Sequence, residues 1–214
     1  MMVARLVPNI SVPLFIRRRT AEILSVTLAV AGVALLLSLL TYDSADPSLN
    51  RLSDAQPRNL LGFFGATLAD MVYQSVGWLS ALPVVAFFGW SWRLMKKDTT
   101  LHLSWRAVAL IIALVSGASL LALLGAVTHA GFLHDAGGAV GVLIAFLLVP
   151  KLTVWGSGFL ALLGFVVSIP VALGLKLKEW AVAAHIMHLG WMRVHGAAFG
   201  LISLFRQPMC DAEM

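Results

Sequence analysis

Four long apolar runs, each bounded by polar residues, organise this chain of 214 residues. An α-helix rises about 1.5 Å per residue, so about 20 apolar residues are needed to cross the roughly 30 Å hydrocarbon core of a bilayer. The runs therefore predict an all-α integral membrane protein with four transmembrane helices, at about residues 21–41, 77–95, 107–127 and 154–175.

Two of the apolar regions are too long for a single crossing. Residues 60–94 would form a helix of about 52 Å, and residues 137–175 a longer one, whereas tilt accommodates only a modest excess. Asp70 lies in the first half of the former region, and a charge at mid-bilayer costs about 2.5–3.5 kcal/mol. Pro150-Lys151 divides the latter. We therefore predict outer interfacial or re-entrant helices before spans two and four.

The stretch "TYDSADPSLN", Thr41 to Asn50, ends the first apolar run. Tyr42 suits the headgroup region, Asp46 requires water, and Pro47 cannot continue a helix, which indicates an exit from the bilayer. A cleaved secretory signal is the alternative for this first span. The run is longer than a usual signal core of about 7–15 residues and no small-x-small cleavage site precedes Tyr42, so an uncleaved signal anchor is favoured.

The positions of Lys and Arg predict the orientation, because basic residues are retained on the cytoplasmic side. They concentrate in the amino-terminal tail, in the loop after span two, and beyond span four. These three regions are placed in the cytosol, and both termini with them. The residues that carry this prediction most directly are Arg17, Arg18, Arg19, Lys96 and Lys97.

The segments outside the spans complete the predicted organisation. Residues 1–20 form a basic cytoplasmic tail, and residues 207–214 the start of a linker. In residues 176–206, apolar positions recur every three or four residues with cations between them, as in an amphipathic helix on the inner leaflet. A fifth span is the alternative, but the charge density of this segment disfavours it.

Composition agrees with a membrane protein: 60% of the residues are hydrophobic, 12% are charged, and the mean hydropathy is +0.91. The net charge of +5 does not indicate a nucleic-acid surface, because the cations lie beside apolar runs instead of forming one stripe. The single cysteine, Cys210, excludes an internal disulfide framework.

Few polar groups offer candidate chemistry. Asp70 could be an ion ligand, although an interfacial acid needs no such role, and Lys151 could bind a substrate, although it can extend its amine to water at the outer boundary. His185, His188 and His195 share a helical face, but they lack an acid or thiol ligand nearby. No phosphate-binding loop or nucleophile elbow is present. We predict no catalytic, cofactor-binding or metal-binding residues.

The two halves of the chain follow the same order of features. Each has an outgoing span, an outer loop, a Gly-x-x-Gly segment and a tryptophan at the returning span. Parallel repeats occur in transporters, and a small four-span transporter or channel is the alternative function. Chance similarity between apolar segments explains the same pattern equally well. The glycines concerned are Gly62, Gly65, Gly138 and Gly141.

The order of several motifs resembles the amino-terminal four-helix membrane domain of the FtsK/SpoIIIE DNA translocases, over residues 17 to about 180. The motifs are "RRRTAEILSVTLAVAGVALLLSLLTYDSADPSLN", "NLLGFFGATLADMVYQSVGWLSALP" and "GGAVGVLIAFL". Their most specific residues are Tyr42, Asp46, Pro47, Gly62, Gly65 and Asp70, and Gly138 with Gly141 form a weaker element.

This resemblance implies a multi-pass anchor in the bacterial inner membrane at the division septum, where it helps to assemble the divisome. Its implied partners are the lipid bilayer, divisome membrane proteins and further copies of itself, as a hexamer in the full-length family. The family's ATP-driven motor, with its ATP, Mg and DNA contacts, has no counterpart in this sequence. The chain itself is therefore not expected to be an enzyme, and we expect an excised, truncated or split product.

Overall fold

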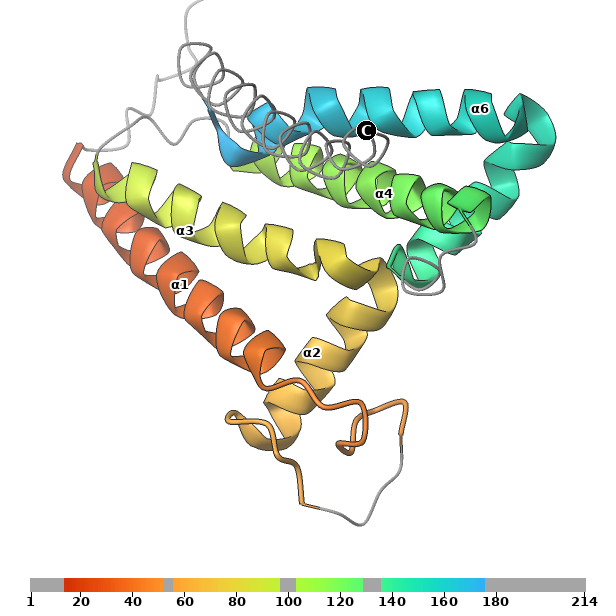
Figure 1. Ribbon diagram of the computed structural model, residues 1–214. Coiled ribbons are helices and arrows are strands. Elements are labelled where there is room, and N and C mark those ends of the chain that lie inside the picture. The colour runs from red at the N-terminus through yellow and green to blue at the C-terminus, as the bar shows by residue number, and fades with distance from the viewer. Residues whose placement is uncertain (1–13, 52–55, 97–102, 129–135, 176–214) are drawn as a thin grey trace, which may run out of the picture. The chain divides into compact units, whose positions relative to one another are not determined.

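The computed structural model describes residues 14–51, 56–96, 103–128 and 136–175. Contacts divide the chain into two units, Met1–Gly174 and Leu175–Met214, and every described helix belongs to the first. The predicted amphipathic helix at 176–206, the three histidines, Cys210 and Lys97 lie outside the described residues. The helices are α1 (Leu14–Leu40), α2 (Gly62–Val76), the short 3-10 helix η1 (Gly77–Ser80), α3 (Ala81–Met95), α4 (Leu103–Thr128) and α6 (Gly138–Leu173) (Figure 1).

Four helical segments are long and apolar enough to cross a membrane, and the described residues contain no β-strand beyond an isolated bridge between Ser48 and Arg51. For the described residues, this confirms the prediction of an all-helical fold with four segments that are able to cross a membrane. Large apolar side chains such as Trp155, which is 82% exposed, project from the helices, as expected for a surface in contact with lipid. The segments are Arg18–Leu40, Gly62–Met95, Leu103–Thr128 and Gly138–Leu173.

The second segment is interrupted at Gly77, whose φ of 58° places it outside the helical region between α2 and η1. The fourth is interrupted at Thr153, which has φ 61° and ψ 172° within α6. The predicted division at Pro150-Lys151 is therefore displaced by a few residues. Pro150 removes one backbone hydrogen bond but stays helical, and the break follows it. Thr153 occupies a conformation that is nearly exclusive to glycine and strained for a β-branched residue.

The two broken segments have matching backbone geometry. Gly62 and Gly138, which begin α2 and α6, have φ values of 62° and 60°. The positive-φ residues Gly77 and Thr153 each follow 15 residues later. Chance similarity of composition does not produce equal conformations at equal spacing, so the geometry supports a parallel repeat of two halves.

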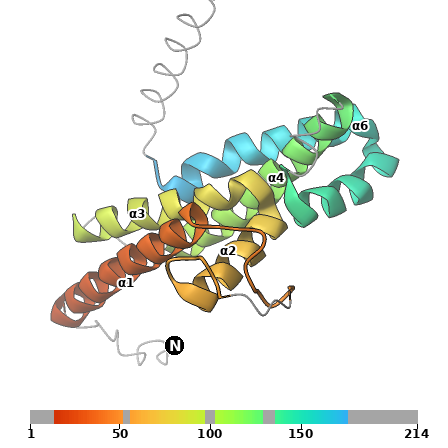
Figure 2. The same cartoon turned by 60° about the horizontal axis from the view of Figure 1, so that its bottom comes forward.

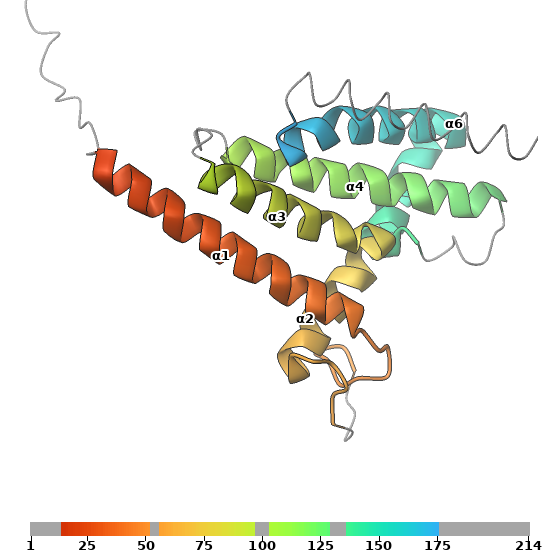
Figure 3. The ribbon, with the colours of Figure 1, turned by 60° about the vertical axis from the view of Figure 1, so that its left-hand side comes forward.

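The helices pack as two main pairs, α1 with α3 and α4 with α6 (Figures 1, 2 and 3). The indole Nε1 of Trp90 on α3 donates a hydrogen bond of 2.6 Å to the carbonyl of Ala172 on α6. The hydroxyl of Ser91 donates one of 2.7 Å to the carbonyl of Ser25 on α1. These bonds join the end of α3 to the start of α1 and the end of α6, around a cluster of small and apolar side chains: Ala86, Trp90, Ala109, Leu110 and Ala172.

Cations surround this same end of the helices. Arg18 and Arg19 form ion pairs with Glu22 of 3.2 and 2.8 Å within α1. The amine of Lys96 lies 4.5 Å from the ring centroid of Trp92 at the end of α3. Helix α1 begins at Leu14, so Arg17 to Arg19 of the predicted tail are helical. The backbone carries these charges just beyond the apolar part of α1.

Candidate functional site

A buried carboxylate organises the polar residues at the opposite end of α1. Asp70 on α2 is 7% exposed and accepts hydrogen bonds from three neutral side chains. The Tyr42 hydroxyl donates over 3.1 Å and the Gln74 amide over 2.6 Å, both to Oδ1, whereas the Ser48 hydroxyl donates over 2.6 Å to Oδ2. We call Tyr42, Ser48, Asp70 and Gln74 the Asp70 cluster. Its donors replace the water that a buried carboxylate loses.

Tyr42 links the end of α1 to α2 in two ways. Its hydroxyl binds Asp70, and its ring centroid lies 5.1 Å from that of Tyr73. Burial, together with the hydrogen bond to Asp70 and its negative charge, raises the pKa of Tyr42 from 10.0 to about 12. Tyr42 therefore stays protonated, and remains a donor, throughout the physiological range.

We expect alkaline titration of the protein, followed by tyrosinate absorbance, to show a transition near pH 12 that Tyr42→Phe removes. Because the pKa is raised on folding, the stabilisation from the protonated phenol is complete below pH 10.0 and is lost as the pH rises through about 12. The chain has only two tyrosines, so the transition is resolvable. A Tyr42→Phe protein that retains it would contradict the assignment.

A second carboxylate closes the loop between α1 and α2, residues 41–61, which we call the outer loop after its predicted side of the membrane. Asp46, which is 6% exposed, accepts the backbone N–H groups of Arg58 over 2.9 Å and Asn59 over 3.0 Å. The Asn59 amide in turn donates to the carbonyls of Ser38 over 2.8 Å and Thr41 over 3.2 Å. Asn59 therefore caps the carboxyl end of α1, where backbone carbonyls have no partner within the helix.

Asp43 is a third acid of the same loop and is half-buried, whereas its partner Arg58 is exposed. Its carboxylate accepts a hydrogen bond of 2.8 Å from the backbone N–H of Ala45 and forms an ion pair of 3.2 Å with Arg58. The hydrogen bond from Ala45 and the positive charge of Arg58 lower the pKa of Asp43 below its ordinary value. Unlike Asp46 and Asp70, Asp43 holds its partners at the surface, where water screens the interaction.

Gly65 explains why the loop can lie so close to α2. A Cβ at this position would overlap the Asn59 side-chain oxygen and lie 2.6 Å from the Cβ of Leu61. A larger residue would therefore displace the asparagine that caps α1. The Asp70 cluster and this cap hold the two ends of the outer loop against α1 and α2.

The beginning of α6 meets the α2–η1 break at a second close contact. A Cβ on Gly138 would lie 2.6 Å from the Ser75 carbonyl oxygen and 2.7 Å from the Gly77 nitrogen. The backbone N–H of Trp78 donates over 3.0 Å to the carbonyl of Ala136. On the other side of α6, a Cβ on Gly141 would overlap the Ala118 carbonyl of α4. These glycines bring three helices together through their backbones.

The structure thus separates the residues selected from the sequence into three places. The first place is the outer loop and the adjoining part of α2, which hold Tyr42, Asp46, the buried Pro47, Gly65 and Asp70. Gly62 begins α2 beside them, and its N–H donates a hydrogen bond of 2.8 Å to the carbonyl of Asn59. Gly138 and Gly141 lie at the α6 contact, and Arg18, Arg19 and Lys96 at the opposite end of the helices. Ser48 and Asn59 were missed. Asn59 lies three residues before α2, and short polar residues are common just before a helix, which was the available signal for it.

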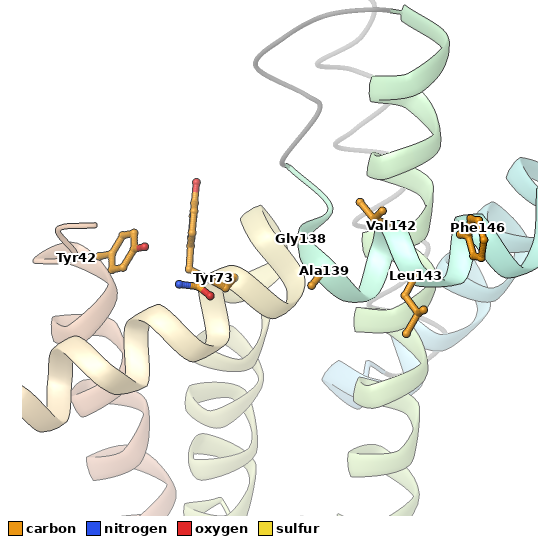
Figure 4. A pocket seen from close by; sticks show the side chains of 8 residues that line it. Tyr42, Tyr73, Gly138, Ala139, Val142, Leu143 and Phe146 are labelled. Carbon is orange, nitrogen blue, oxygen red and sulfur yellow. The ribbon is translucent and has the colours of Figure 1, made fainter. Parts of the chain in front are cut away.

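A groove of about 710 Å³ lies beside the Asp70 cluster, between α2 and the first half of α6 (Figure 4). A second cavity of about 400 Å³ lies between α4 and α6. Neither is lined by Asp70 or Lys151, and the buried apolar side chains of the described residues are Leu, Val, Ala and Trp. This geometry does not favour the transport alternative, which requires a water-filled path through those groups.

Residues 17–185 match the model of a family described as the 4TM region of DNA translocase FtsK/SpoIIIE. The chain belongs to this family. The match concerns the membrane region of the FtsK/SpoIIIE translocases, with no ATPase motor domain indicated.

Three relatives illustrate the extent of similarity, each named DNA translocase FtsK. The Azospirillum brasilense protein is 32% identical over 196 residues, which are 87% of this chain and 31% of that protein. The Pseudomonas aeruginosa protein is 31% identical over 147 residues, 65% of this chain and 18% of that protein. The Agrobacterium fabrum protein is 29% identical over 161 residues, 72% of this chain and 18% of that protein. The chain spans less than a third of these curated relatives, and no solved structure matches it.

Proposed function

We propose that this chain is the non-enzymatic membrane anchor of a DNA translocase that coordinates cell division with chromosome segregation. It lies in the inner membrane at the division septum and helps to assemble the divisome. The observation that carries the proposal is the family match over residues 17–185. ATP, Mg and DNA are assigned to the motor region of the family, which residues 17–185 do not match, and self-association as a hexamer would follow from that motor.

The proposed orientation places both termini in the cytosol. The cations Arg18 and Lys96 lie at the end of the helices where Trp90 binds the carbonyl of Ala172, and Arg106 of α4 lies beside Gly174 at the end of α6. Since basic residues are retained inside, this end faces the cytosol and the outer loop faces the periplasm. Four crossings then return the chain to the side from which it started.

Helix α2 is proposed to lie at the outer interface. Its buried face includes Gly65, Ala69 and Asp70, whereas Phe64 and Met71, seven residues apart, are exposed on the other face. A helix with one face against protein and an apolar face outward is suited to the headgroup boundary. The first half of α6, which the break at Thr153 separates from the second, takes the corresponding position in the other half-repeat.

The proposed mechanism is positional. Anchoring raises the effective concentration of attached domains near the septum, and no bond-making residue is needed. Two hydrogen-bonded carboxylates, Asp46 and Asp70, order the outer loop, so it can present a defined surface to other division proteins. Leu49 and Leu60 of this loop, 70% and 69% exposed, supply apolar contact area there.

A fusion of a fluorescent protein to the carboxyl end tests location and orientation together. We expect fluorescence concentrated at midcell in dividing cells, from a reporter that matures only in the cytosol. Uniform fluorescence over the whole membrane would contradict the septal role. A full-length, membrane-inserted fusion without fluorescence would contradict the cytoplasmic carboxyl end.

A further inference from the structure

We propose that the groove between α2 and α6 is a binding site for one phospholipid. Its two walls differ in chemistry (Figure 4). Tyr42, Tyr73 and Gln74 form the wall on the side of α1 and α2, and Val142, Leu143 and Phe146 form the wall on α6. A phospholipid has a polar ester and phosphate region beside a hydrocarbon chain, and this is the amphiphile that surrounds a membrane-spanning protein.

The polar wall has a donor available for such a ligand. The hydroxyl of Tyr42 and the amide NH₂ of Gln74 already donate hydrogen bonds to Asp70. The Tyr73 hydroxyl, in contrast, makes no hydrogen bond within the described residues, although its ring packs on Tyr42. In Figure 4 its ring extends away from the α2 backbone with the hydroxyl at its tip. Tyr73 is therefore assigned to the phosphate or ester oxygens of the lipid.

The apolar wall continues into the second cavity. Val142 and Phe146 line both spaces, and the cavity of about 400 Å³ between α4 and α6 is otherwise lined only by apolar residues such as Ala126 and Val149. An acyl chain that starts beside Tyr73 can pass Phe146 into this cavity. The glycine contacts of Gly138 and Gly141 bring α2, α4 and α6 together where the two spaces begin.

The size of the groove favours a lipid over a helix of a partner protein. A helix about 10 Å across occupies about 400 Å³ per turn, so a groove of 710 Å³ would hold less than two turns. Sites for small ligands usually have about 300–1,000 Å³, a range that includes both cavities. This inference rests on the membrane location and not on the proposed role in division.

Native mass spectrometry of the full chain, released from detergent and titrated with dioleoylphosphatidylethanolamine, tests the proposal. We expect one tightly bound lipid, and its loss in Val142→Trp, which fills the groove. Leu147→Trp is the matched control, because Leu147 lies on the same helical segment at 50% exposure, against 51% for Val142, and lines neither space. Equal binding by both variants, or equal loss in both, would overturn the proposal.

Tyr73→Phe tests the polar contact separately, since it keeps the ring and removes one hydroxyl. We expect about a two- to tenfold weaker lipid affinity, the range for one hydrogen bond. Glycerophosphoethanolamine, the headgroup without acyl chains, is expected not to compete. Unchanged affinity in Tyr73→Phe would remove the headgroup assignment, and competition by the free headgroup would show that the apolar cavity is not used. Circular dichroism and gel filtration verify that each variant folds.

Discussion

Replacing Asp70 with alanine is expected to release the outer loop and to lower the free energy of unfolding by about 2–4 kcal/mol. The substitution removes three hydrogen bonds at once, from Tyr42, Ser48 and Gln74, and leaves their donors without the acceptor they share. Asp70→Asn should be milder, because its amide oxygen can still accept two of these bonds. Thermal unfolding followed by circular dichroism should rank the three proteins from most to least stable as wild type, Asp70→Asn and Asp70→Ala.

Release of the outer loop is measured separately, by proteolysis, because a loss of global stability does not show which part of the protein has opened. Arg51 and Arg58 lie in the outer loop, and trypsin added to the outside of intact spheroplasts should cleave there faster in Asp70→Ala than in wild type. Asp43→Asn is the control, since it removes an acid of the same loop whose ion pair with Arg58 is exposed to solvent. Equal cleavage of all three proteins would contradict the role of the Asp70 cluster in ordering the loop.

Replacing Gly138 with alanine is expected to lower the free energy of unfolding by about 2–5 kcal/mol, which is the second large effect. The residue has φ 60°, which an L-residue with a Cβ adopts only at a cost, and the new Cβ would meet the backbone of Ser75 and Gly77 at 2.6 and 2.7 Å. Backbone atoms at a helix break cannot move aside as a flexible side chain can. The contact between α6 and the α2–η1 break should therefore separate.

Gly158→Ala is the matched control, because it makes the same change in the same helix at a position with no atom within 4 Å of the new Cβ. There the change should stabilise the helix by about 0.5–1 kcal/mol. The two substitutions are therefore expected to change the free energy of unfolding in opposite directions relative to wild type. A Gly138→Ala protein as stable as Gly158→Ala would contradict the close contact.

The long apolar regions show where prediction from sequence succeeds and where it stops. Residues 60–94 were divided at about Gly77 because the polar residues Asp70 and Gln74 lie in the first half of the region, and α2 does end at Val76. In the fourth region Pro150 was taken as the division, but the non-helical residue is Thr153. Proline weakens a helix locally, and packing of α6 against α4 decides which neighbouring residue absorbs the bend.

The sequence by itself determined the number of apolar segments, the polar stretches between them and the end at which cations gather, because each depends only on the local cost of burying charge in hydrocarbon. The tertiary structure alone decided which polar groups meet. Asp70 lies 22 and 28 residues from Ser48 and Tyr42, and Asn59 lies 21 residues from Ser38. Such partners depend on the path of the outer loop and on the glycine contacts that set how closely the helices approach, and neither is a property of any one segment.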